Sequence, residues 1–238
     1  MYGSWVLLVL IFISSLPVIV VYIWFCIAKY RFSLVWFLFA LLAGAATFFP
    51  ALILQELFSI SSFTQGRLAL FFEFFVRVAL TEELSRLFIL FIFFWISGLI
   101  SKENLVEPGE GLDQQFSFSL VQKGAATGLI AGLGFSILES ARFAASSMEF
   151  GIILLRFFTA ALHGACGSRV GVAVVMFRAN PVRALLRVIT ATAIHGVYNF
   201  MVIRPGVPLI IAFLIAISAL TTSIFTIRGA SKETPQIP

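Results

Sequence analysis

The sequence predicts an all-α fold, a polytopic bundle of transmembrane helices that forms a single domain over residues 1–238. Two observations support this prediction. Hydrophobic side chains make up 61% of the chain and charged ones only 11%, whereas soluble proteins average about 45–50% and 25%. The mean hydropathy is +1.07, and the apolar residues form long stretches. The same composition excludes a disordered chain, a nucleic-acid-binding module and a disulfide scaffold.

Seven stretches are long enough to be spans, because a helix needs about 20 apolar residues to cross a hydrocarbon core of roughly 30 Å. They cover residues 5–28, 34–58, 69–100, 121–145, 150–177, 182–203 and 207–227. We expect about seven spans, and at most eight, because the third stretch is long for one crossing. Its beginning, around residues 67–77, is a candidate interfacial segment. The first stretch lacks the basic start and the cleavage site of a signal peptide, so we expect a span there too.

The distribution of basic residues predicts the orientation. Nine basic residues lie in one set of loops and about three in the other, and cytoplasmic loops are the basic ones. We therefore expect the N-terminus outside, the C-terminus in the cytoplasm, and a location in the cytoplasmic (inner) cell membrane. The acidic loop at 101–119 is the only sizeable soluble segment. The first set is Lys29, Arg31, Lys102, Lys123, Arg178, Arg183, Arg187, Arg228 and Lys232, and the second is Arg67, Arg142 and Arg204.

Four charged residues stand out because they lie inside predicted spans: Glu82, Glu83, Arg86 and Glu139. An ionised side chain at the centre of a span costs about 2.5–3.5 kcal/mol on insertion scales. Such groups must face the bundle interior and find partners there, and a functional site is the default interpretation.

The two histidines reach a similar depth. At about 1.5 Å per residue, Glu82 and His163 each lie roughly 20 Å from the outer end of their spans, and His195 lies roughly 18 Å from the inner end of its own. Glu139 is somewhat nearer the outer surface. Polar groups from four helices are therefore expected to meet near the midplane.

Helical phase places these groups on packed faces. His195 and Asn199 are four residues apart and share a face. Arg86 is four residues from Glu82 and three from Glu83, so it can pair with either. Small residues at helical spacing allow close helix contact. Two such faces are expected, one with Gly124, Gly128, Gly132, Phe135 and Glu139, the other with Arg156, His163, Gly167 and Gly171.

This inventory suits amide hydrolysis by activated water. Glu82 and Glu83 point about 100° apart on a helix, so one carboxylate would handle the water while the other is held by Arg86 or a backbone donor. An imidazole can share the water, and the Asn199 amide can donate to a developing oxyanion.

A zinc ion is the alternative to a metal-free site. Zinc would be held by His163 and His195 together with Glu82, Glu83 or Glu139. The sequence contains no HExxH motif, and on that ground a metal-independent, glutamate-type mechanism without a cofactor is favoured over zinc.

Four motifs in order resemble those of the PrsW intramembrane proteases. Residues 82–86 (EELSR) resemble the EExxK/R motif and residues 132–139 (GLGFSILE) the GxGFxxxE motif. Residues 162–164 (LHG), followed by Gly167, are similar to the third motif, and residues 195–199 (HGVYN) to HxxxN/D. The resemblance covers roughly residues 75–205, and the motif-bearing core is about residues 69–203.

The resemblance implies an endopeptidase related to the CAAX-prenyl and bacteriocin-processing (CPBP) enzymes. Its substrate would be a membrane-tethered, single-span regulator such as an anti-sigma factor. The expected partners are this substrate and the lipid bilayer. By the same resemblance, Glu82 and Glu83 activate and position water, His163 is the imidazole partner, and Glu139 is a further polar member. His195 and Asn199 form the oxyanion side, with Arg86 and Phe135 in support.

Two departures from the related patterns bear on these roles. Arg86 stands where the motif more often has lysine, and Glu139 stands where the CAAX-type relatives have histidine, so His163 would have to supply that imidazole.

Other interpretations of the same residues remain. A proton- or ion-coupled transporter could use a buried Glu/His network, although no symmetric halves are visible. Glu139 could simply bond Arg156, and Glu73 is expected to pair with Arg77. The sequence leaves the oligomeric state open.

Overall fold

The computed structural model describes residues 3–28, 33–58, 67–98, 100, 119–144, 150–203 and 209–229, and all regular secondary structure in these ranges is helical. Of the acidic loop expected at 101–119, only Ser119 lies among the described residues. The elements are α1 (Gly3–Ile27), α2 (Leu34–Leu57), α3 (Arg67–Phe71), η1 (Phe72–Leu80), α4 (Thr81–Ile96), α5 (Leu120–Ala144), α6 (Phe150–Met176), α7 (Pro181–Ile203) and α8 (Leu209–Gly229).

The structure is a helical membrane bundle. Among the described residues, five helices are long and apolar enough to cross a membrane, namely α2, α5, α6, α7 and α8. Their bounds lie within a few residues of the expected stretches. The first expected span is also helical and forms α1. Within α1, Ser15–Ile27 is an apolar helical segment shorter than the five spans.

The third expected span differs from one continuous α-helix. It consists of the short α3, a nine-residue π-helix η1 and the 16-residue α4. At the junction, the Thr81 hydroxyl lies 2.6 Å from the carbonyl oxygen of Arg77 and 3.0 Å from that of Val78. The hydroxyl can thus donate a hydrogen bond to a backbone carbonyl oxygen where the pattern changes from π-helical to α-helical. Such π-helical segments often accompany functional sites, and this one ends two residues before Glu82.

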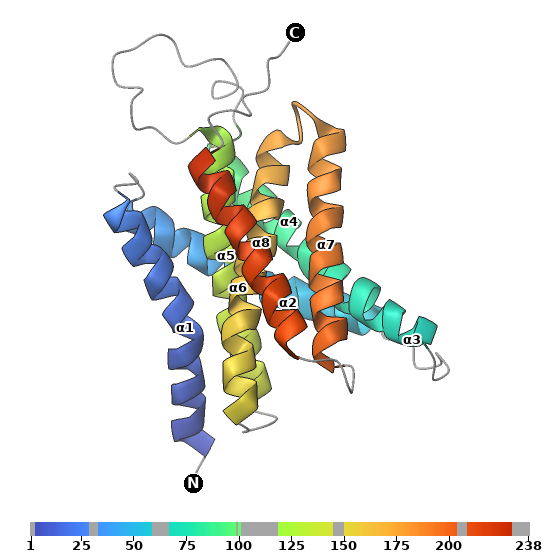
Figure 1. The fold of residues 1–238 in the computed structure, drawn as a ribbon. Helices are drawn as coiled ribbons and strands as arrows, with labels where there is room; N and C mark the ends of the chain where they lie inside the picture. Colours follow the sequence, from blue (N-terminus) through green and yellow to red (C-terminus); the bar gives the residue numbers. More distant parts are fainter. Residues whose placement is uncertain are drawn as a thin grey trace, which may run out of the picture.

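Helices α5 and α6 form the centre of the bundle, with α8 lying across them and α1 and α7 on opposite flanks (Figure 1). Glycines allow their backbones to approach closely. A Cβ atom on Gly128 would collide with the backbone of Gly167, and one on Gly132 with the carbonyl group of His163. The expected packing faces are therefore confirmed, and the Gly132 contact brings α5 against the residue on α6 that bears an imidazole.

Helix α2 packs on α5 by the same means. A Cβ atom on Gly44 would collide with the backbone of Ala131, and one on Gly134 with that of Leu41. This close packing holds α2 beside the centre of the bundle, with its last turns near η1 and α4.

Candidate active site

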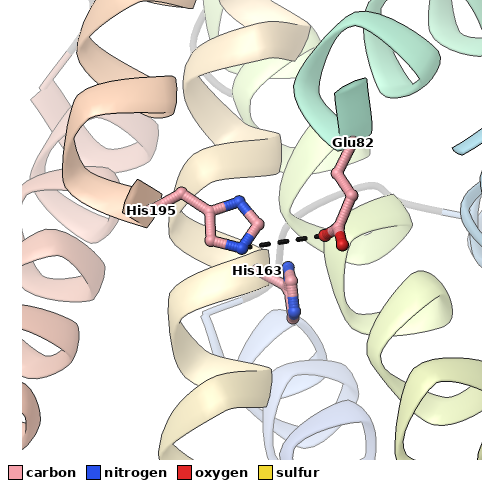
Figure 2. Close-up of side chains that lie close together, drawn as sticks. All are labelled: Glu82, His163 and His195. Carbon is pink, nitrogen blue, oxygen red and sulfur yellow. Dashed lines mark ion pairs between the residues drawn. The ribbon is translucent and has the colours of Figure 1, made fainter. Parts of the chain in front are cut away.

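The site lies between three helices. Glu82 and Glu83 are in the first turn of α4, His163 is on α6 and His195 on α7. Each of these four residues is at most 3% exposed. Figure 2 shows Glu82, His163 and His195 converging from their separate helices.

Glu83 is held from two sides. One carboxylate oxygen, Oε1, lies 2.9 Å from Nδ1 of His195, and the other accepts a hydrogen bond from Arg86. The Glu83 and Arg86 side chains are fully buried. A carboxylate paired with arginine accepts hydrogen bonds only, so Nδ1 of His195 is the donor. In a neutral His195 ring, the lone pair is then on Nε2, the nitrogen that is not bonded to Glu83.

Glu82 is held from one side only. Its Oε1 accepts a hydrogen bond of 2.9 Å from Nε2 of Gln55, on α2. Its Oε2 is buried and has no hydrogen-bond partner among the described residues, although Nε2 of His195 lies 3.7 Å away. A buried carboxylate oxygen without a partner is costly, which indicates that Oε2 has a role toward a ligand or substrate.

His163 is oriented by a second carboxylate. Its Nε2 lies 2.9 Å from Oε2 of Glu139, and the same oxygen accepts a hydrogen bond of 2.9 Å from Nη1 of Arg156. The Glu139–Arg156 pair, which the sequence offered as an alternative interpretation of Glu139, is therefore present, and it is linked to His163 as well. Nδ1 of His163 has only a 3.4 Å contact with Nη2 of Arg86, longer than a usual hydrogen bond from an N–H group.

The rings around these charges fix their positions. The Phe135 ring is 4.9 Å from that of His163 in an edge-on arrangement, and the Arg86 guanidinium lies 5.1 Å from its centre. The rings of His163 and His195 are 4.9 Å apart and perpendicular. Phe135 is only 1% exposed and packs against both His163 and Arg86.

Asn199 lies one turn along α7 from His195 and is half-buried. Within the described part of the chain, its side chain makes no hydrogen bond, so its amide can donate to another molecule. The neighbouring Tyr198 hydroxyl lies 3.0 Å from that of Thr159 and is part of the packing between α6 and α7.

A metal ion fits the donors that these contacts leave. Glu82, His163 and His195 each offer one ligand atom, and the three atoms lie within 4.8 Å of one another. The carboxylates of Glu83 and Glu139 are hydrogen-bonded to His195 and His163. Histidine ligands of metal ions usually have such a carboxylate partner on their other nitrogen. The unpartnered Oε2 of Glu82 is the observation that most favours such an ion.

The structure thus brings together seven of the site residues expected from sequence, namely Glu82, Glu83, Arg86, Phe135, Glu139, His163 and His195. Asn199 lies one turn further along α7, and its side chain makes no hydrogen bond or ion pair with them in the described residues. The structure also distinguishes the adjacent carboxylates of Glu82 and Glu83, because Arg86 pairs with Glu83 and not with Glu82. One residue is new. Gln55 belongs to a stretch in which the sequence shows nothing diagnostic, and the only available signal was a polar amide near the end of an apolar run.

A membrane bundle with carboxylates and imidazoles gathered inside it suits hydrolysis by activated water, as well as ion-coupled transport. The sequence profile of the PrsW family of intramembrane metalloproteases matches residues 33–224. The chain therefore belongs to this family, and it is a multi-pass membrane protein of the protease class. This membership favours proteolysis over ion-coupled transport. No curated protein and no solved structure matches the chain.

Proposed function

We propose that the protein is an intramembrane endopeptidase that uses a zinc ion held by Glu82, His163 and His195. The observation that carries the proposal is the buried group of three ligand atoms within 4.8 Å, one of them the unpartnered Oε2 of Glu82. Catalytic zinc sites commonly have three protein ligands from nitrogen and carboxylate oxygen, with a further position left for water or substrate. The family's description as metalloproteases supports the same choice.

Zinc, when bound, would supply a water-derived nucleophile at neutral pH and a Lewis acid for the scissile carbonyl. The chain's own residues prepare that site. Glu83 fixes the His195 ring through Nδ1 and is itself neutralised by Arg86. Glu139, neutralised by Arg156, fixes the His163 ring through Nε2. Each imidazole thus keeps its other nitrogen, Nε2 of His195 and Nδ1 of His163, available to bind the zinc ion.

Gln55 and Asn199 complete the proposed division of roles. Gln55 donates to Oε1 of Glu82 and directs Oε2 toward His195. The Asn199 amide donates to the substrate carbonyl, whose oxygen gains negative charge during attack by water. In the metal-independent alternative, Glu82 itself would take the proton of the attacking water.

We further propose a substrate that is a membrane-tethered, single-span protein, such as an anti-sigma-factor-like regulator. The buried position of the site supports a substrate that is itself in the membrane. In this proposal residues 1–238 form one protease domain with seven spans, an outer N-terminus and a cytoplasmic C-terminus, in the cell membrane. The basic loops support this orientation.

Cleavage of a single-span reporter by the purified chain in nanodiscs tests the proposal. Zinc content is measured on the same samples. We expect one zinc per chain, loss of cleavage after chelation, and recovery on adding zinc. His163→Ala should abolish both cleavage and zinc binding, whereas the matched control Glu73→Gln should retain both.

The outcomes separate the alternatives. Cleavage that survives complete removal of metal but is lost in His163→Ala would establish the metal-independent mechanism. Cleavage that survives His163→Ala would show that this site is not the active site.

A further inference from the structure

Arg169, on α6, is a charged residue inside a membrane-spanning helix and lies apart from the candidate active site. Its Nη1 donates to the carbonyl oxygen of Ala165 at 2.8 Å and to the Ser223 hydroxyl at 3.1 Å. It also lies 3.3 Å from the carbonyl oxygen of Ala219. Nη2 donates to the Thr222 hydroxyl at 2.5 Å. All four acceptors are neutral, so the positive charge is solvated but not balanced.

The other arginines of the bundle interior differ in this respect. Arg77 pairs with Glu73, Arg86 with Glu83, and Arg156 with Glu139. Arg169 has no carboxylate partner among the described residues. Since an unbalanced charge inside a membrane is costly and is retained mainly for function, this exception calls for an anion.

Arg169 lies nearer one end of the bundle than its middle. It is about 10 Å from the end of α6, and Thr222 is about 10 Å from the end of α8. These two helix ends lie at the same end of the bundle (Figure 1).

Thr222 lies on the exposed surface of α8, so the Nη2 end of the Arg169 guanidinium reaches the bundle surface there. A guanidinium has five N–H donors, and Nε and the second hydrogen of Nη2 are not used by the four contacts. Phe225, one turn from Thr222 on α8, is a large apolar side chain that is 66% exposed.

We propose that Arg169, whose Nη2 is held at the bundle surface by the Thr222 hydroxyl, binds the phosphate of an anionic phospholipid headgroup. Arginine suits phosphate because its planar fork can donate two hydrogen bonds to it, and basic sites between transmembrane helices bind anionic lipid headgroups. Free inorganic phosphate has the same chemistry, but the exposed apolar side chain of Phe225 beside the site favours the lipid, whose acyl chains can cover it. This site is independent of the proposed zinc site.

Native mass spectrometry of the detergent-purified chain tests the proposal. Apparent dissociation constants are measured for phosphatidylglycerol and for phosphatidylcholine of the same acyl chains. We expect the wild type to bind phosphatidylglycerol more tightly. Arg169→Gln should weaken that binding about fivefold, the effect of about 1 kcal/mol per cation near an anionic surface. Arg142→Gln, which removes an exposed arginine from the last turn of α5, should not weaken it.

Two further measurements keep the test decisive. Thr222→Val removes the hydroxyl that accepts from Nη2 of Arg169 and donates to the carbonyl oxygen of Ala219, and it should lower the preference for phosphatidylglycerol even if Arg169→Gln fails to fold. An excess of inorganic phosphate should leave lipid binding unchanged, and displacement of the lipid by phosphate would overturn the lipid as ligand. Equal binding of the two lipids by the wild type, or equal losses in Arg169→Gln and Arg142→Gln, would overturn the site itself.

Discussion

Two acidic–basic groups follow one another along residues 67–96 and differ in what surrounds them. Glu73 and Arg77, in η1, form an i,i+4 pair at 2.8 Å with side chains 40% and 29% exposed. Glu83 and Arg86, in α4, form an i,i+3 pair with fully buried side chains. Both pairs have the spacing that stabilises a helix, so spacing alone does not distinguish them.

The difference comes from other helices. Among the described residues, the Glu73–Arg77 pair is joined to another helix by the hydrogen bond that Arg77 donates to the carbonyl oxygen of Gln55. Glu82 and Glu83 instead meet the side chains of Gln55 and His195, from α2 and α7. A charge pair becomes a candidate site where several helices direct polar groups at it and leave one atom unpartnered. The following predictions test this comparison, from the largest effect to the smallest.

Glu82→Gln should have the largest effect. The substitution keeps the size of the side chain but removes the charge on Oε2, the atom without a hydrogen-bond partner. We expect cleavage to fall about 10²–10⁴-fold and zinc to be lost, as measured by reporter cleavage in nanodiscs and metal analysis. Unchanged cleavage in Glu82→Gln would show that the buried group with Glu82 and Glu83 is no more important for activity than the Glu73–Arg77 pair.

Glu83→Gln should reduce both activity and stability. It removes the carboxylate that orients His195, and loss of an outer partner of a ligand costs about 10–100-fold. It also leaves the buried Arg86 unpaired, which costs about 3–5 kcal/mol. Thermal unfolding should therefore shift to lower temperature. The double variant Glu83→Gln/Arg86→Met should recover stability but not activity, and recovery of both would assign the pair a purely structural role.

Glu139→Gln should lower zinc affinity about tenfold, at the weaker end of the range for outer partners. The amide oxygen can still accept a hydrogen bond from His163, but the pairing with Arg156 is weakened. Zinc competition with a chromogenic chelator measures the change. Arg156→Gln keeps the carboxylate at His163 and should have a smaller effect, so the opposite order would contradict the proposed role of Glu139.

Gln55→Leu should slow cleavage about 2–12-fold, the effect of one hydrogen bond of about 0.5–1.5 kcal/mol. Glu82 would keep its charge but lose the donor to Oε1. Gln122→Leu is a matched control, because the Gln122 amide donates to the carbonyl oxygen of Ile227 away from the site. Equal rates for the two variants would show that Gln55 does not position Glu82.

Much of the fold could be predicted because it depends on composition and on spacing within single helices. The apolar stretches predict α2, α5, α6, α7 and α8, and the glycine spacing predicts the contact between α5 and α6. The π-helix could not be predicted, because a run of apolar residues has no feature that separates it from an α-helix. It arises where the register must change before Glu82.

The residues of the site could be predicted better than the way in which they contact one another. Buried charge identified Glu82, Glu83, Glu139 and both histidines, but the choice of partner for Arg86 depends on side-chain rotamers and on His195. Gln55 was missed because an amide is a weak signal in sequence. Arg169 was missed because a lone arginine among small residues has no partner at helical spacing on its own helix.

Glu73→Gln should have the smallest effect. The pair is partly exposed, and exposed ion pairs contribute about 0–1 kcal/mol. Arg77 would keep its hydrogen bond to the carbonyl oxygen of Gln55, so the end of α2 should stay in place and Gln55 should still reach Glu82. We expect cleavage and zinc content close to wild type. A large loss of activity with normal zinc content would mean that η1 itself takes part in admitting or holding the substrate, and the two groups would then belong to one functional segment.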